Sequence, residues 1–245
     1  MAQLQTLVKA LDILTLLGQS DHPMSVEELA VALGLPKSTV YRLIQTLEAK
    51  DFARRYSRSE IDLGYHFINL GRSAYGRIEQ GLLRSARPLL QSMAERYEET
   101  AILSIRSGLE SVCIYSVPSR HPIRFTPEDH RALPLYVGAS SLAILAWESQ
   151  SVVAQVLDQQ AEEAGRKKLT CWLEEIRSQG YVITDNQFDS AALGIAAPVY
   201  DNNGKIYASV ALVGPDSRML PKGIEIYIAA VREVADKITQ QLKSK

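Results

Sequence analysis

The sequence has few of the features that mark secreted, membrane or metal-binding proteins. Its two cysteines, Cys113 and Cys171, lie far apart and form neither a CxxC pair nor a disulfide framework. No apolar run approaches the roughly 18 residues that span a membrane. The N-terminal stretch is broken by Lys9 and Asp12 and has no small-residue cleavage site, unlike a signal peptide. We therefore predict a cytoplasmic protein without membrane contact.

An excess of either charge is also lacking, since 27 Lys and Arg residues balance 28 Asp and Glu residues to give a net charge of −1. A globally basic nucleic-acid-binding protein is excluded, so any such surface must be local. The apolar content of 46% is normal for a soluble globular protein. At about 150 residues per domain, the 245 residues predict one large or two modest domains.

The first 64 residues have the pattern of three short helices followed by a hairpin. Apolar residues at helical spacing mark the first helix: Leu4, Leu7, Val8, Leu11 and Leu14. Ser25 and Glu28 predict a capping box on the second helix, which Gly34 ends. Pro36 suits the first position of a third helix over 36–49. The polar segment "FARRYSRSEIDLG" then favours a small hairpin, which is the order of a winged helix-turn-helix.

The predicted helix 36–49 has two different faces. Its apolar stripe centres on Val40, Ile44 and Leu47, and its opposite face carries polar side chains that suit base edges and phosphates. From residue 37 to residue 58 the chain has six basic and two acidic residues, a local charge of +4. An ordinary solvated face is the alternative interpretation. We predict the following DNA-binding residues: Lys37, Ser38, Thr39, Tyr41, Arg42, Gln45, Arg54, Arg55 and Arg58.

The remaining sequence predicts a connecting helix over 65–80 and a larger α+β domain. A helix follows near residues 83–97, and "TAILSIRSGLESVCIYSV" has two β-rich runs around Gly108, which is a hairpin signal. "GIAAPVYDNNGKIYASVALVG" predicts a second hairpin with "DNNG" as its turn. Helices are expected over 151–179 and at the C-terminus. This pattern indicates an antiparallel sheet packed with helices.

Five collinear segments resemble the isocitrate lyase regulator (IclR) family of bacterial transcription regulators. They are "LVKALDILTLL", "SVEELAVALGLPKSTVYRLIQTLE", "PLLQSMAERYEETAILSIRSG", "LPLYVGASSLAILA" and "GIAAPVYDNNGKIYASVALVGP". The resemblance implies a winged helix-turn-helix over 1–64, a linker helix over 65–80 and a GAF-like effector-binding and oligomerisation domain over 81–245. It also implies dimers, or dimers of dimers, that bind a palindromic operator in double-stranded DNA. A small ligand would control repression or activation of catabolic genes, with repression favoured and no cofactor.

The resemblance also implies where the effector binds. The helix start at 138–141 is built of small residues whose N–H groups suit an anion, although a small-residue packing contact is the alternative. The family often has Cys at the position of Gly194 and Ser at those of Ala211 and Val213. Fewer side-chain hydrogen bonds favour an organic acid with an apolar or aromatic body. The predicted ligand-binding residues are Gly138, Ala139, Ser140, Ser141, Asp185, Gly194, Ala211 and Val213.

Two acidic residues depart from the family pattern. Asp51 stands where the family usually has Gly, and Asp62 lies near a position that is usually basic. We therefore expect the wing to hold DNA mainly through its three arginines. A separate basic loop either steers an anion or is a solvated or oligomer-contact segment; its residues are Arg120, His121, Arg124, His130 and Arg131.

Two rival functions are weaker. "GASSL" is not the G-x-S-x-G pattern of a serine hydrolase, and no histidine placement argues for a catalytic base. His121 and His130 are nine residues apart, which is not a metal-ligand spacing on a helix. We therefore predict neither an enzyme nor a metal site. The second rival is a ligand-sensing module that has lost DNA binding, for which Asp51 and Asp62 give some support.

Overall fold

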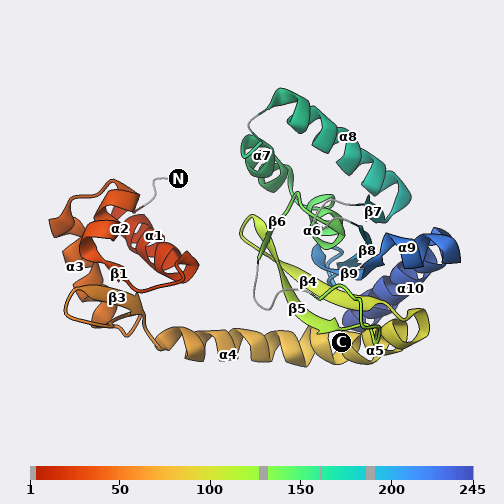
Figure 1. The fold of residues 1–245 in the computed structure, drawn as a ribbon, viewed down its shortest axis with the longest axis horizontal. Helices are drawn as coiled ribbons and strands as arrows, with labels where there is room; N and C mark the ends of the chain where they lie inside the picture. Colours follow the sequence, from red (N-terminus) through yellow and green to blue (C-terminus); the bar gives the residue numbers. More distant parts are fainter. Residues whose placement is uncertain (1–3, 127–131, 161, 186–190, 245) are drawn as a thin grey trace. The chain divides into compact units, whose positions relative to one another are not determined.

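A computed structural model describes residues 4–126, 132–160, 162–185 and 191–244 of the chain. The chain divides into two compact units, Met1–Ile78 and Glu79–Lys245 (Figure 1). Among the described residues, none of the helices combines the length and the apolar character that crossing a membrane requires.

The first unit contains the three predicted helices, the predicted hairpin and the start of the linker. Its helices are α1 (Gln5–Gln19), α2 (Val26–Leu33), α3 (Lys37–Glu48) and α4 (His66–Ile78). Its strands are β1 (Met24–Ser25), β2 (Ala53–Arg55) and β3 (Glu60–Leu63), in the antiparallel order β1-β3-β2. The two-residue strand β1 was not predicted. The winged helix-turn-helix architecture is confirmed.

Local signals in the sequence fix the ends of α2 and α3. Ser25 and Glu28 form the reciprocal capping box, and Gly34 ends α2 in the left-handed conformation with φ of 60°. The placement of Pro36 as the first helical residue is wrong by one position. Pro36 has an extended backbone with ψ of 137° and is the N-cap, so α3 begins at Lys37.

The core of this unit is formed by the apolar faces of its helices and by β3. Ile13 of α1, Leu29 of α2, Ile44 of α3 and Ile61 of β3 are fully buried. Because Val40, Leu43 and Ile44 face this core, the opposite face of α3 points to solvent. The core therefore sets the direction of the predicted DNA-reading side chains.

The helix α4 lies within the range 65–80 given for the connecting helix. The helix α4 is followed directly by a π-helical turn over Glu79–Leu83 and by α5 (Arg84–Tyr97). None of the residues of α4 is buried, whereas Leu82 and Leu83 are fully buried. The division between the two units falls at the first residue of the π-helical turn.

The second unit is built on a six-stranded antiparallel sheet in the order β6-β5-β4-β9-β8-β7. Its strands are β4 (Thr100–Ser107), β5 (Glu110–Val117), β6 (Leu133–Pro134), β7 (Val182–Asp185), β8 (Ala192–Tyr200) and β9 (Ile206–Pro215). Both predicted hairpins, β4–β5 and β8–β9, are confirmed. The edge strand β7 was not predicted.

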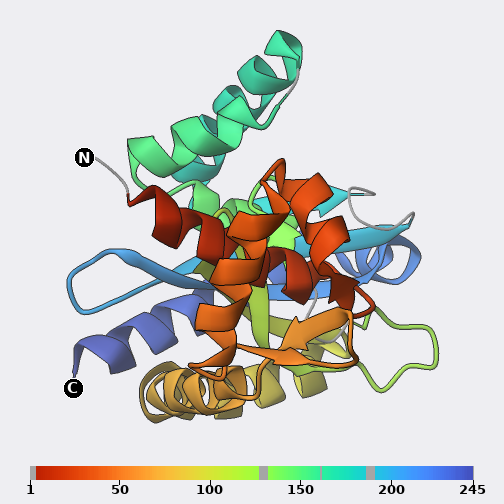
Figure 2. The ribbon, with the colours of Figure 1, turned by 90° about the vertical axis from the view of Figure 1, so that its left-hand side faces the viewer.

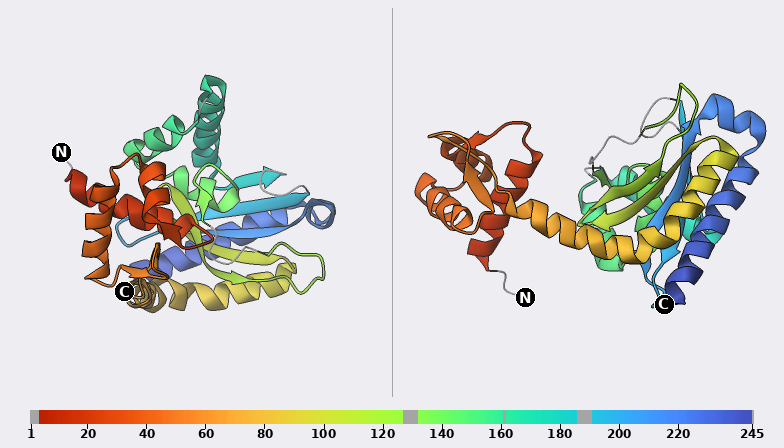
Figure 3. Two further views of the ribbon diagram at one scale, coloured as in Figure 1. Left: turned by 60° about the vertical axis from the view of Figure 1, so that its left-hand side comes forward. Right: turned by 90° about the horizontal axis from the view of Figure 1, so that it is seen from below.

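Helices cover both faces of this sheet. They are α5, α6 (Ala139–Leu145), α7 (Gln150–Asp158), α8 (Glu163–Gln179), α9 (Asp216–Met219) and α10 (Ile224–Lys243), with a 3₁₀ turn at Leu220–Lys222. On one face, α5 and α10 run side by side (Figure 3, right). On the other face α6 lies against the sheet, and α7 and α8, at the top of Figure 2, pack over it.

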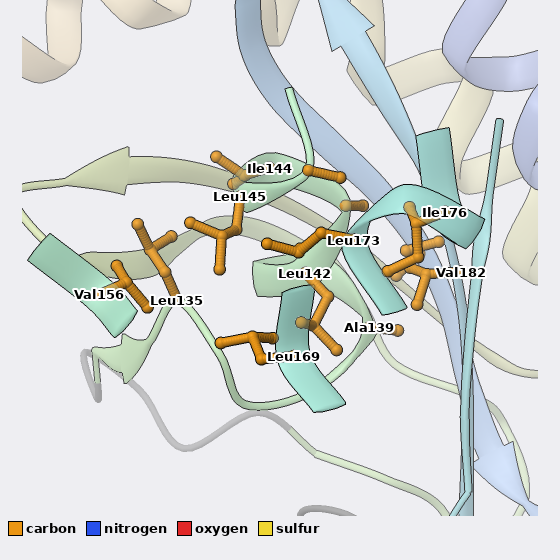
Figure 4. Close-up of a cluster of buried hydrophobic side chains, with 14 of the residues drawn as sticks. Leu135, Ala139, Leu142, Ile144, Leu145, Val156, Leu169, Leu173, Ile176 and Val182 are labelled. Atoms are coloured by element: carbon orange, nitrogen blue, oxygen red, sulfur yellow. The ribbon is translucent and has the colours of Figure 1, made fainter. Parts of the chain in front are cut away.

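The helical prediction over 151–179 is confirmed as two helices, because α7 ends at Asp158 and α8 begins at Glu163. The polar run between Leu157 and Leu169 has no apolar stripe to hold one continuous helix on the core. Both helices instead contribute side chains to one buried cluster with α6, including Val156, Leu169 and Leu173 (Figure 4). This cluster fixes α6 on the sheet.

Candidate nucleic-acid interface and effector site

The exposed face of α3 carries the side chains that the sequence singled out. Ser38, Tyr41, Arg42 and Gln45 are exposed, and Thr39 is half-buried. Tyr41 retains 45% of its accessible surface although it is a large aromatic residue. The helix-turn-helix arrangement therefore presents hydrogen-bonding groups and an aromatic ring from a rigid element, which is the geometry of a recognition helix.

A groove of about 550 Å³ lies between the start of α3 and the wing. Ser38, Tyr41 and Arg42 line it from α3, and Arg55 and Arg58 line it from the hairpin. Sequence reasoning missed three further lining residues, Val26 and Glu27 of α2 and Ser59 of the hairpin turn. The groove gathers polar and cationic groups from three elements, as a phosphate-bearing ligand requires.

Not all of the cations at this surface are equally available. Lys37 Nζ lies 2.9 Å from Glu27 Oε1, and this hydrogen bond lowers the pKa of the Glu27 carboxyl. Arg55 Nε lies 3.2 Å from Glu48 Oε1. The first pair is exposed and the second is partly exposed; ion pairs at a surface are weak and exchange readily for phosphate. Within residues 4–126, the side chains of Arg42 and Arg58 have neither a hydrogen-bond nor an ion-pair partner.

The wing contains one tightly held arginine. Arg54 Nη2 lies 2.5 Å from Asp62 Oδ2, and Arg54 Nε donates to the carbonyl of Leu63 at 3.2 Å. The carboxylate of Asp62, which stood out as an acidic departure from the family pattern, is therefore paired within the hairpin. The charge of Arg54 is balanced by the same contact.

The second candidate site lies at the start of α6. Gly138 precedes α6 with φ of 79°, a conformation that glycine adopts readily. A Cβ built on Gly194 of β8 would lie 3.1 Å from Ala139 Cβ and 3.9 Å from Val213 Cγ2. The structure thus brings together Ala139, Gly194 and Val213, which are far apart in sequence. It adds Thr184 of β7, whose Oγ1 would lie 2.9 Å from that Cβ and which sequence reasoning missed.

The two serines of this segment differ in their surroundings. Ser140 is half-buried, whereas Ser141 is fully buried. The Oγ atoms of Ser141 and of Ser111 on β5 are 2.7 Å apart. This hydrogen bond satisfies a hydroxyl inside the core and gives Ser141 a structural role.

The last strand follows the expected alternation only in part. Ala211 is fully buried and pairs with Ala196 on β8 and with Ile102 on β4. Tyr207 departs from the alternation along β9, because a register shift lies between Val199 and Tyr200 of the partner strand. Ile206 packs against the cluster instead, and Tyr207 is 37% exposed. Asp185 is exposed at the end of β7, where it pairs with Leu193.

The basic loop is held by carboxylates and by its own backbone. Arg120 Nη2 lies 2.9 Å from Glu95 Oε1, and Arg124 Nη1 donates to the carbonyl of His121 at 3.2 Å. His121 Nε2 lies 4.0 Å from Glu98 Oε2. The two other residues of this prediction, His130 and Arg131, lie outside the described residues.

Comparison with protein families decides the assignment. Residues 6–56 match the IclR helix-turn-helix domain, and residues 78–240 match the C-terminal domain of the bacterial transcriptional regulator IclR. The chain belongs to the IclR family. IclR proteins are transcriptional regulators, so this chain is a DNA-binding regulator with a C-terminal effector domain and not an enzyme.

Curated IclR relatives are similar over almost their full length. The transcriptional repressor AllR of Klebsiella pneumoniae is 28% identical, with 97% of this chain and 90% of that protein covered. The transcriptional repressor IclR of Escherichia coli K12 is 26% identical, with 97% and 89% covered.

Solved structures of the IclR family have the same fold. An IclR transcriptional regulator from Silicibacter sp. TM1040 superposes with a TM-score of 0.84 at 24% identity, with 97% of this chain and 96% of that chain covered. An IclR homologue from Microbacterium hydrocarbonoxydans, solved with 4-hydroxybenzoate, gives a TM-score of 0.71 at 20% identity, with 98% and 100% covered. At these identities the structures establish the fold alone.

Proposed function

We propose that this IclR protein is a repressor that binds a palindromic operator and is controlled by a small carboxylate-bearing metabolite. The observation that carries the DNA-binding part is the exposed face of α3. This face presents Arg42, Gln45 and Ser38 beside the groove that lies between α3 and the wing. Arg can bind guanine in a bidentate manner, Gln can bind adenine, and Ser with nearby N–H groups can bind phosphate.

The same groove supports assignment of the other DNA-binding residues. Lys37 and Thr39 lie in the first turn of α3, where phosphates are favoured by unpaired N–H groups. Tyr41, Arg55 and Arg58 line the groove and would contact the sugar-phosphate backbone. In this proposal Arg42 and Gln45 read bases, and the others set the register of the protein on DNA.

The effector is an organic acid with an apolar or aromatic body that binds beside Gly194. Ala139, Gly194 and Val213 lie together there and offer apolar surface without side-chain donors. Gly138, Ser140 and Asp185 border this region, and Ala211 lies two residues from Val213 along β9, on the same face of the sheet. Support for this ligand class comes from the Microbacterium homologue, whose ligand, 4-hydroxybenzoate, is a benzene ring with a carboxylate.

The direction of control and the target genes rest on the relatives. AllR and the Escherichia coli IclR protein are both named repressors, which favours repression here. Catabolic genes as targets and a dimer, or dimer of dimers, as the active form come from the family resemblance. The rival function is a ligand-sensing module whose helix-turn-helix has lost DNA binding.

Footprinting on DNA upstream of the protein's own gene and of its divergent neighbour tests the proposal. We expect protection of two half-sites whose centres lie about 34 Å, or a multiple of it, apart. That result would locate the operator, and the substrate of the neighbouring gene product would nominate the effector. Uniform, unselective protection or none would contradict the proposal and favour the sensor-only module.

A further inference from the structure

Arg54 is held on several sides within the wing. Besides its contacts with Asp62 and with the Leu63 carbonyl, its guanidinium lies 4.9 Å from the ring centroid of Tyr65 and 5.7 Å from that of Tyr56. Two of its three nitrogens donate to oxygen atoms of β3, and two aromatic rings flank it. Only a planar guanidinium can make this combination of forked hydrogen bonds and ring contacts.

These contacts connect three parts of the first unit. Arg54 lies on β2, Asp62 and Leu63 lie on β3, and Tyr65 directly precedes α4. Phe52, which directly precedes β2, packs its ring against the rings of His66 and Phe67, with ring centroids 4.8 and 5.3 Å apart. The base of the hairpin is thereby tied both across its strands and to the start of the linker helix.

The turn at the other end of the hairpin is closed by short-range hydrogen bonds of its own. The Tyr56 N–H donates to the Glu60 carbonyl at 2.9 Å, and Ser57 Oγ donates to Glu60 Oε2 at 2.8 Å. Arg55 Nη1 donates to the carbonyl of Arg58 at 3.3 Å, while the side chains of Arg55 and Arg58 line the groove beside α3. The direction of the turn therefore depends on the pairing of β2 with β3, which Arg54 and Asp62 join directly opposite each other. This charge-assisted pair, with side chains 33% and 30% exposed, is more enclosed than the Lys37–Glu27 pair, whose side chains are 64% and 59% exposed, and it is the stronger of the two.

We propose that Arg54 is a positioning residue of the wing, and that Asp62 and Tyr65 hold it there so that Arg58 faces DNA. This inference rests on the proposed DNA-binding function and refines it. In this account Arg54 contributes to DNA affinity through Arg58 and makes no phosphate contact itself. The acidic residue at position 62 strengthens DNA binding, contrary to the sign that its charge alone predicts.

Substitution of Asp62 separates positioning from simple electrostatics. Asp62→Asn removes a negative charge beside DNA, so charge counting predicts tighter binding. If Asp62 instead positions Arg54, loss of their charge-assisted hydrogen bond should weaken DNA binding about tenfold. Arg54→Lys keeps the positive charge but loses the planar guanidinium, which makes the two hydrogen bonds and the contacts with both aromatic rings. It should weaken DNA binding by a similar factor. Glu60→Gln also removes a carboxylate from β3, but its amide oxygen can still accept the hydrogen bond of the Ser57 hydroxyl, which lies 2.8 Å from Glu60 Oε2. This variant should bind as the unsubstituted protein does or tighter.

The measurement is a fluorescence titration of each variant with operator DNA, with the active fraction determined separately from Kd. A merely structural role would lower the active fraction and leave Kd unchanged. In the Arg58→Gln background, Asp62→Asn should change Kd by less than about twofold, because the two substitutions would act on one contact. Asp62→Asn binding as tightly as the unsubstituted protein, or additive effects with Arg58→Gln, would overturn the proposal.

Hydrogen exchange at residues 53–63 tests the same claim without DNA. We expect faster exchange in Asp62→Asn and in Arg54→Lys than in Glu60→Gln and the unsubstituted protein. Equal exchange rates in all four proteins would overturn the positioning role. Failure of the unsubstituted protein to select any DNA would instead contradict the proposed function, and the exchange result would still decide whether Arg54 orders the wing.

Discussion

Asp51 occupies a backbone position that glycine tolerates better than any other residue. Its φ is 60°, and the Asp51 and Phe52 N–H groups donate to the carbonyls of Glu48 and Leu47 at 3.0 and 2.9 Å. This is the arrangement that closes a helix with a left-handed residue. The family usually has Gly at the matching position, so the departure has a local conformational cost in addition to its negative charge.

Replacement of Asp51 by glycine should therefore stabilise the first unit. We expect Asp51→Gly to raise the free energy of unfolding by up to about 1 kcal/mol, through relief of the left-handed backbone. Thermal unfolding followed by circular dichroism would measure it. Asp51→Ala removes the same charge without relieving the backbone and is the control; an equal gain from both variants would assign the effect to charge.

A buried carboxylate in the second unit depends on one arginine. Glu99 is fully buried, and both of its oxygens accept hydrogen bonds from Arg218, Oε1 from Nε at 2.6 Å and Oε2 from Nη2 at 2.5 Å. Hydrogen bonding to Glu99 raises the pKa of Arg218. The backbone approaches so closely that a Cβ on Gly214 would lie 2.1 Å from Glu99 Oε2.

Removal of Arg218 should be costly because Glu99 would stay buried without a partner. We expect Arg218→Met to lower the free energy of unfolding by about 3 kcal/mol. Urea denaturation of the full chain would measure the loss. The double variant Arg218→Met/Glu99→Gln should recover part of the loss, and a cost below about 0.5 kcal/mol for the single variant would show that the pair contributes little.

Among the elements, α2 shows how a short helix is stabilised at its start. The Ser25 N–H donates to Glu28 Oε2 at 2.7 Å, and this hydrogen bond lowers the pKa of Glu28 below its usual value of 4.5. A carboxyl whose pKa is lowered by folding stabilises the folded state above its unfolded pKa. That contribution is lost as pH falls through the folded pKa.

Glu28→Gln should reproduce this pH dependence. At pH 7 we expect the variant to have a lower Tm than the unsubstituted protein, because the charged partner of the Ser25 N–H is gone. The difference should shrink as the pH falls below about 4.5, where the carboxyl becomes neutral in the unsubstituted protein as well. Melting curves over a pH series would test it; a difference independent of pH would exclude the carboxylate charge as its cause.

Elements with their own repeating pattern could be predicted from sequence, and elements defined by their partners could not. The helices α1, α2 and α3 and both hairpins carry apolar periodicity and turn residues, which act locally. The strands β1 and β7 are two and four residues long and become strands only by pairing with β3 and β8. Too few residues are present in either strand for alternation to mark it.

The same limit applies to the candidate sites. The exposed face of α3 follows from helix geometry, so Arg42 and Gln45 could be placed from sequence. The pairing of Arg54 with Asp62 depends on the register of β2 with β3, and the contact of Ser141 with Ser111 joins α6 to β5. Sequence spacing could not reveal either contact. Thr184 beside Gly194 was missed for the same reason, because it lies on the unpredicted strand β7.

A regulator of this kind must sense a ligand through its second unit. An organic acid that binds only the folded state should stabilise it by about 2.7 kcal/mol at one hundred times its Kd. Thermal shift against a panel of aromatic and aliphatic carboxylates would measure this effect, with neutral analogues of the same size as controls. Stabilisation only by very polar sugar acids would contradict the proposed ligand class.

The two functions must also be coupled in the intact protein. A ligand shifts the DNA-binding equilibrium only by the ratio of its affinities for the two states of the regulator. We expect the same compounds that raise Tm to change the affinity for operator DNA, in the direction of release if the protein is a repressor. Operator DNA would in turn change the affinity for the ligand by the same factor, because linkage between two binding sites is reciprocal.

The reading of DNA by α3 is decided by the affinity for operator and for scrambled DNA at 50 and 200 mM salt, measured for the unsubstituted protein and for Arg42→Ala. We expect selective binding that falls roughly 10³-fold between these salt concentrations if several phosphates are contacted. Arg42→Ala should weaken operator binding by about 1–3 kcal/mol and reduce selectivity. Equal affinity for both DNAs, unchanged by Arg42→Ala, would contradict the claim that α3 reads DNA.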